Sequence, residues 1–298
     1  MIDAFTTHQV YVPSPMPDKP QPAPPLEFAL PGLRVLALSG ADALAFAQSQ
    51  FMNDVAALGD GQWQWNGWLN AKGRLVALFA LLRLDAQTLW LLGYADPDAL
   101  AGKLQRYVFR SKVVLQPLAA LHASGCFAAP QSASGATFAR LGDAIELDMG
   151  SDAGARTLRL APDPARTDAE AATRWNADDL ACGLPHLDAS QLEQWTPQQL
   201  SLDRLQAYSV KKGCYPGQEI VARTHFLGQV KRGIALFEAQ APVAAGASVD
   251  AGGQSLGTIA SVAGRHVLAV LPLEQALEGL AADGIALTPR PLVGGLQR

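Results

Sequence analysis

The segment 211–219 holds the residue types of this sequence that are best suited to covalent or metal chemistry. It reads Lys-Lys-Gly-Cys-Tyr-Pro-Gly-Gln-Glu and places Cys214 between two glycines. Between 211 and 232 there are five Lys or Arg residues and one carboxylate, a local charge of +4 in a chain whose net charge is −4. Nearby cations lower the pKa of a thiol, and the thiolate is the form that attacks electrophiles or binds metals. The pattern predicts a reactive Cys214, with an inert cysteine in a basic, solvated turn as the alternative.

The neighbours of the cysteine have expected roles of three kinds. Two cations would lower the pKa of the thiol, two glycines would allow a tight turn, and two polar side chains would hold the loop or a ligand by hydrogen bonds. The two cations are Lys212 and Arg223, and the two glycines are Gly213 and Gly217. The two polar side chains are Gln218 and Glu219. The cations would also suit an anion such as a phosphate or a polyglutamate tail. His225 follows eleven residues after the cysteine, but no orienting side chain is evident, so a thiol hydrolase is not favoured.

The motif at 212–219, Lys-Gly-Cys-Tyr-x-Gly-Gln-Glu, resembles the signature of the YgfZ family. The members of this family are folate-binding relatives of the glycine-cleavage aminomethyltransferase, and they are linked to the maintenance of iron–sulfur enzymes. The resemblance runs from about Leu33 to Arg232, and further shared segments lie at 39–42, 70–73, 107–113, 183–185 and 221–223.

The resemblance implies an α+β fold with two mixed α/β lobes and a small C-terminal β-barrel around a central cavity. That cavity would bind tetrahydrofolate or a derivative, with aromatic stacking on the pterin and cations on the glutamate tail. The cofactor-binding residues it implies are Trp175, Arg223, Tyr215, Gly213, Gly217 and Lys72. The implied function is assembly or repair of iron–sulfur clusters in client enzymes, including enzymes that modify tRNA, with Cys214 as the reactive thiolate or a transient cluster ligand.

Three positions differ from the family pattern. Leu33 stands where relatives have a second tryptophan, and Ala181 stands where they have a carboxylate that holds the pterin, although Asp178 or Asp179 would be near enough to replace it. The segment after Gly73 lacks the aspartate that assists one-carbon transfer in aminomethyltransferases. The sequence therefore favours a folate-binding accessory protein. The alternatives are a folate-dependent one-carbon transferase or demethylase, and a non-catalytic scaffold that binds no folate.

The elements that must position these residues follow from hydrophobic periodicity and turn signals. Residues 33–38 predict a strand, and Asp42 predicts the N-cap of a helix over 43–51. Trp63 and Trp65 predict a strand that ends at Asn66-Gly67, with the tryptophans more typical of core than of a ligand cavity. Further predictions are strands over 75–84, 113–115 and 145–149, a helix capped by Asp96, and helical structure over 166–183.

Three regions follow from this pattern. Residues 1–25 form a leader with seven prolines between 13 and 25, which excludes regular helix or central strand. Residues 26–227 form the two-lobed folate-binding region. Residues 228–298 have short apolar runs separated by glycines, which predicts a small β-barrel.

Composition limits the class of protein. Charged residues make up 17% of the 298 residues, and the net charge of −4 argues against direct binding of nucleic acid. The longest apolar run, 75–82, is too short to span a membrane, so no membrane partner is expected. Three scattered cysteines predict a reducing, cytoplasmic setting and cannot supply four cluster ligands alone. Zinc, NAD and ATP motifs are absent, and the oligomeric state is open.

Overall fold

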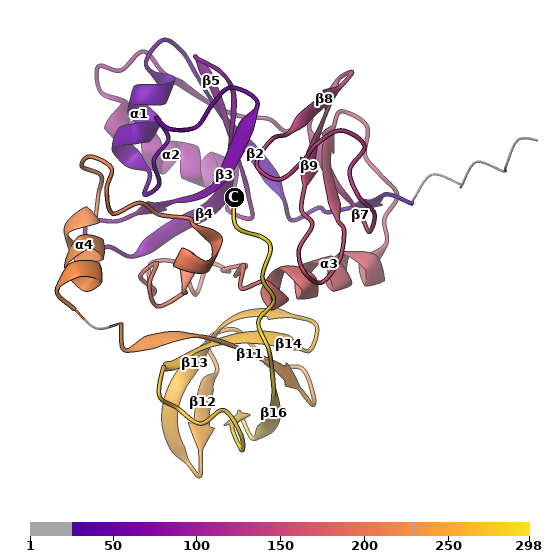
Figure 1. The fold of residues 1–298 in the computed structure, drawn as a ribbon, viewed down its shortest axis with the longest axis vertical. Helices are drawn as coiled ribbons and strands as arrows, with labels where there is room; N and C mark the ends of the chain where they lie inside the picture. Colours follow the sequence, from indigo (N-terminus) through magenta and orange to yellow (C-terminus); the bar gives the residue numbers. More distant parts are fainter. Residues whose placement is uncertain (1–25, 229) are drawn as a thin grey trace, which may run out of the picture.

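The computed structural model describes residues 26–228 and 230–298, so the predicted leader lies outside the described residues. In the described part, two five-stranded sheets stand side by side above a closed six-stranded barrel (Figure 1). All strand pairs are antiparallel. This is the α+β arrangement of two lobes and a barrel that the sequence predicted.

The first lobe is a sheet with the strand order β3-β4-β5-β2-β6 and two helices on its outer face. Its elements are β2 (Arg34–Ser39), α1 (Ala43–Gln50), β3 (Gln62–Leu69), β4 (Leu75–Asp85), β5 (Thr88–Gly93), α2 (Pro97–Val108) and β6 (Val114–Pro117). Apolar side chains of both helices and the sheet form one core between them. The Asp96 carboxylate accepts a hydrogen bond from the amide of Ala99 at 2.7 Å, which confirms the predicted cap of α2.

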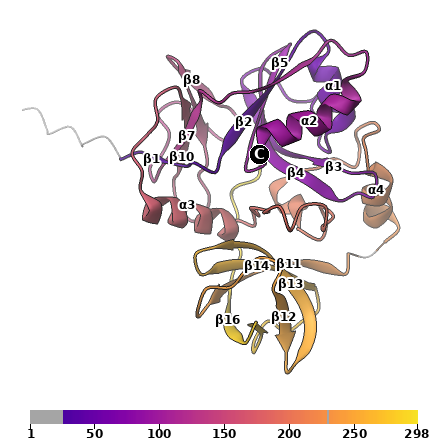
Figure 2. The same cartoon turned by 180° about the vertical axis from the view of Figure 1, so that it is seen from behind.

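The second lobe is a sheet with the order β1-β7-β10-β9-β8, and a helix runs along its lower edge (Figure 2). Its elements are β1 (Phe28–Ala29), β7 (His122–Cys126), β8 (Ala139–Leu141), β9 (Ala144–Asp148), β10 (Thr157–Ala161) and α3 (Ala169–Ala181). A large core joins the two lobes, and Trp63 and Trp65 of β3 lie in it with Leu147 of β9 and Trp175 of α3. Side chains in the space between the lobes therefore pack against residues of both sheets.

The chain then passes under the first lobe before it enters the barrel. A 3-10 helix (Leu202–Leu205) and α4 (Gln218–Phe226) occupy this connection. The barrel closes in the order β11-β14-β13-β12-β15-β16 and has its own apolar core. Its strands are β11 (Arg232–Ala239), β12 (Ser248–Ala251), β13 (Gln254–Ala263), β14 (His266–Pro272), β15 (Ala281–Ala282) and β16 (Ile285–Arg290).

One local prediction was wrong, and a second was confirmed only in part. Strand β3 does not end at Asn66-Gly67, because the buried carboxamide oxygen of Asn66 accepts hydrogen bonds from the amides of Asn53 and Gly67. An asparagine whose oxygen is satisfied in this way is tolerated inside a strand. Asp42 is the N-cap residue of α1, as predicted, but its side chain makes no capping hydrogen bond. Its carboxylate accepts instead from the amide of Lys112 at 2.7 Å and joins two loops of the lobe.

Candidate functional site

Cys214 lies exposed in the loop that leads directly into α4. The loop is closed by a hydrogen bond from the Gln218 carboxamide nitrogen to the carbonyl of Lys212, at 3.1 Å. Gly217 precedes the helix with a φ of 78°, a conformation that favours glycine. Cys126 and Cys182 are buried, where a cysteine behaves as a small apolar residue. Within the described part of the chain, Cys214 is thus the thiol that another molecule can reach.

Lys212 anchors this loop to the first lobe. Its ammonium donates to the carbonyls of Gln48, Phe51 and Asn53, at 2.5, 2.5 and 3.1 Å, where the chain leaves α1. The Tyr215 ring lies 5.0 Å from the same nitrogen. Burial lowers the pKa of Lys212 to about 8. The sequence assigned Lys212 to the thiol, but in the structure its charge is directed to these backbone acceptors.

The cations of the segment 211–232 are accordingly divided. The Arg232 guanidinium donates to the carbonyl of Leu256 in the barrel at 2.9 Å. Lys211, Arg223 and Lys231 are exposed. Glu219 is also exposed, at the start of α4. The positive surface near Cys214 is therefore smaller than the sequence count of five cations indicates.

The turn that carries Lys72 packs directly under this loop, although about 140 residues separate them in sequence. A Cβ on Gly217 would lie 2.6 Å from the carbonyl oxygen of Asn70 and 2.7 Å from the Cα of Gly73. Lys72 is exposed on this turn. Gly213, unlike Gly217, has no atom within 4 Å of the position that a Cβ would occupy. The structure brings together the two motifs at 70–73 and 212–219, and glycine is required at their contact.

A second group of predicted residues lies elsewhere, around a small cavity of about 30 Å³ between the lobes. Trp175 lines it and is fully buried, and Leu33, the position of the second family tryptophan, lines it as well. Trp65 and Tyr94 add aromatic walls. All residues that line this cavity lie within 33–186. Of the predicted cofactor-binding residues, Trp175 lines the cavity, whereas the others lie around the Cys214 loop, on α4 or on the turn that carries Lys72.

A buried charge network borders the cavity at Asp179. One carboxylate oxygen accepts from the Arg156 guanidinium at 2.8 Å, and the other is 3.0 Å from the imidazole of His186. The Tyr94 ring stacks on that imidazole, with centroids 3.9 Å apart. Burial alone would raise the pKa of Asp179, but Arg156 and His186 hold it below its usual range. The Asp179 carboxylate thus lies at the cavity, although Ala181 occupies the position where the relatives have their carboxylate.

Two hydrogen-bond donors at this network remain unused. Neither Nη2 of Arg156 nor the indole nitrogen of Trp175 has a hydrogen-bond partner among the described residues, and both atoms are buried. The Arg156 guanidinium lies 4.6 Å from the Trp175 ring. Buried donors without partners are costly, and a bound group with acceptor atoms would relieve that cost. Arg156 and His186 could not be predicted as part of this site, since no sequence motif connects them to Asp179.

In residues 26–228 and 230–298, no group of three or more His, Cys, Asp or Glu side chains is arranged to hold a metal ion. No helix of the described chain has the length and apolar character needed to cross a membrane.

The arrangement of lobes and barrel is that of an aminomethyltransferase-like protein. The glycine cleavage system aminomethyltransferase T from Bartonella henselae has the same fold, with a TM-score of 0.68 over 91% of this chain and 86% of that chain, at 16% sequence identity. The model of the CAF17 C-terminal beta-barrel domain matches residues 231–292, which contain the barrel strands up to β16.

Two relatives place the chain within this class. Proteins named tRNA-modifying protein YgfZ from Klebsiella pneumoniae and Cronobacter sakazakii are 30% and 31% identical to it over 219 and 220 residues. Each match covers 66% of this chain and 66% of the relative, just under two thirds of its length. The chain belongs to the YgfZ family.

Proposed function

We propose that this protein is a cytoplasmic accessory factor that uses Cys214 in the assembly or repair of iron–sulfur clusters in client enzymes, including enzymes that modify tRNA. The observation that carries the proposal is the exposed thiol on a loop held in place by Lys212, Gln218 and Gly217. A thiol that is presented in this way can reach the surface of a partner protein. The partner in this proposal is the client enzyme, and no direct contact with nucleic acid is required.

The central cavity supports the second half of the proposal, a reduced folate as ligand. Its aromatic walls, the Asp179 carboxylate and the unused indole N–H of Trp175 suit a planar heteroaromatic ring that carries both donors and acceptors. Its size does not suit that ring in the present conformation. About 30 Å³ is far below the roughly 300 Å³ or more of typical ligand sites. Folate binding therefore requires the site to open.

An accessory role is favoured over one-carbon transfer by strand β4. After Gly73 the chain continues with Arg74 and then apolar residues through Leu82, so no carboxylate is present there to move a proton at the folate. Loss of such a group costs a transferase roughly 10² to 10⁴ in rate. Binding of folate without turnover is the expected behaviour.

The decisive experiment is complementation of a bacterium that lacks its own family member. Cys214→Ser should fail to restore the activity of an iron–sulfur tRNA-modifying enzyme, whereas Cys126→Ser should restore it, since that thiol is buried. Equal rescue by both variants, at equal protein levels, would overturn the role of Cys214.

A further inference from the structure

The segment 291–298 leaves the barrel after β16 and rises between the two lobes, where it ends beside the large shared core (Figures 1 and 2). It has no regular secondary structure. Its backbone is held by single hydrogen bonds: the Val293 amide donates to Ala181 of α3, the Val293 carbonyl accepts from Arg204, and the Gly294 carbonyl accepts from Asp152. The segment therefore contacts the second lobe without joining either sheet.

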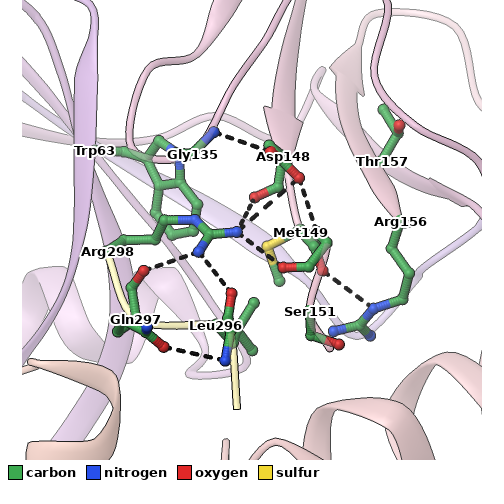
Figure 3. Close-up of polar contacts among 12 residues, drawn as sticks. Trp63, Gly135, Asp148, Met149, Ser151, Arg156, Thr157, Leu296, Gln297 and Arg298 are labelled. Carbon is green, nitrogen blue, oxygen red and sulfur yellow. Dashed lines mark hydrogen bonds and ion pairs between the residues drawn. The ribbon is translucent and has the colours of Figure 1, made fainter. Parts of the chain in front are cut away.

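Arg298 fixes the far end of this segment (Figure 3). Its Nη2 donates to the carbonyls of Asp148 and Gly150, both at 3.0 Å, and its guanidinium lies 5.6 Å from the Trp63 ring centroid. Its Nη1 donates to two carbonyls of the segment itself, at 2.8 and 2.9 Å. The side chain is 8% exposed. One guanidinium thus joins the segment to strands of both lobes.

The same segment packs behind residues that line the cavity, although none of its own residues is part of the lining. Trp65, which lines the cavity, donates its indole N–H to the carbonyl of Leu296 at 2.8 Å. Leu296 is 1% exposed and belongs to the core cluster that also contains Trp65, Met149 and Trp175. Met149 also lines the cavity. Its two neighbours in sequence, Asp148 and Gly150, provide the carbonyls that bind Arg298. Withdrawal of the segment would free space and the Trp65 donor next to the aromatic walls.

Gly295 fits tightly against the backbone of the second lobe. Its φ of 88° lies in the left-handed region, and a Cβ there would come within 2.8 Å of the backbone nitrogen of Asp152. A side chain at this position would push the segment away from the second lobe. Gly253, in the barrel turn between β12 and β13, has a similar φ of 84° but nothing within 4 Å, so it provides a matched control.

We propose that residues 291–298 act as a detachable strap that closes the central cavity, and that a planar heteroaromatic ligand enters when the strap is released. This inference rests on the ligand half of the proposed function and explains why the cavity has suitable chemistry but too little volume. If ligand binds only when the strap is released, the apparent affinity is the intrinsic affinity multiplied by the released fraction. Variants that weaken the docked state should therefore bind more tightly.

The test is calorimetric titration of the full chain with 5-formyltetrahydrofolate as a stable reduced folate. Gly295→Ala and Arg298→Ala should each lower the apparent Kd about tenfold relative to wild type, while Gly253→Ala should leave it unchanged. In wild type, saturating ligand should also accelerate hydrogen exchange at the Val293 amide, whose bond to Ala181 exists only while the strap is docked.

The other outcomes separate the strap from the ligand. Equal Kd values in all four proteins, or weaker binding in the two strap variants, would overturn the strap and leave folate binding intact. Absence of saturable binding in every protein would overturn both the strap and the folate half of the proposed function. The role of Cys214 would still be tested separately by the complementation experiment.

Discussion

Asp179 shows how a single buried carboxylate organises the space between the lobes. It holds Arg156 from the segment before β10 and His186 from the segment after α3, and all three side chains are largely withdrawn from solvent. Removal of one partner from a buried ion pair leaves the other charge uncompensated, which costs far more than the intact pair contributes. The geometry of the cavity wall therefore depends on this carboxylate.

Asp179→Asn should lower the free energy of unfolding by about 3 to 5 kcal/mol at neutral pH, because it strands the buried Arg156 guanidinium. Urea denaturation measures this. Asp178→Asn is the matched control: burial raises the pKa of Asp178, so loss of its charge should be neutral or slightly stabilising. Since the folded-state pKa of Asp179 is lowered, its contribution should be present at neutral pH and decline below about pH 4. A cost that is the same for both variants would contradict the network.

Lys212 makes a prediction of the same sign as Asp179, a stability that rises with pH, but in the alkaline range. Its folded-state pKa is lowered to about 8 from an ordinary value of 10.5, so the unfolded chain binds more protons between these values. The stability of wild type relative to Lys212→Met should therefore rise by roughly 1 to 3 kcal/mol from pH 8 to 10.5. Lys211→Met, at an exposed neighbour, should show no such trend in the same urea titrations. A flat difference for Lys212→Met would mean that its ammonium is not penalised by burial.

At the scale of elements, local patterns predicted several helices and strands, and most securely those whose marker residues have their partners nearby in the sequence. The cap at Asp96 is of this kind, because the carboxylate and its amide partner are three residues apart. Asn66 misled the prediction, and Asp42 marks the predicted helix start but bonds elsewhere, because their partners, Asn53 and Lys112, come from loops that no local pattern connects to them. The candidate site divides in the same way: the Cys214 motif is continuous in sequence, whereas the Asp179 network is assembled from separate segments.

The contact between the Asn70–Gly73 turn and the Cys214 loop should depend on Gly217. Gly217→Ala should destabilise this contact by about 1 to 2 kcal/mol from its left-handed backbone alone, with overlap against Gly73 adding to that cost. We expect faster hydrogen exchange at the start of α4 and reduced complementation. Gly213→Ala, in the same motif but with open space around it, should behave as wild type. If neither variant changed hydrogen exchange or complementation, the loop would not depend on this contact.

In the whole molecule, the barrel and the lobes have separate apolar cores that few residues bridge. The barrel core is formed by its own strands, and a smaller cluster joins it to α3 through Leu180 and Leu268. The segment 291–298 provides a further connection, because its residues follow β16 in the chain but bury Leu296 in the core between the lobes. The periodicity of the barrel strands was readable from the sequence. The place of this segment was not, since its partners are about 150 and 230 residues away.

Leu296→Ala tests whether this connection stabilises the lobes rather than the barrel. Removal of a fully buried leucine should cost about 2 to 5 kcal/mol, depending on how far the core relaxes around the gap. Leu273→Ala, at a leucine 61% exposed, should change stability by less than about 0.5 kcal/mol. Hydrogen exchange should locate the loss: amides of β3 and β9 should lose protection, while those of β12 should keep theirs, because no residue of that barrel strand belongs to the core that contains Leu296. Equal loss in the barrel and the lobes would instead mean that the molecule unfolds as one cooperative unit and that the strap cannot be released by itself.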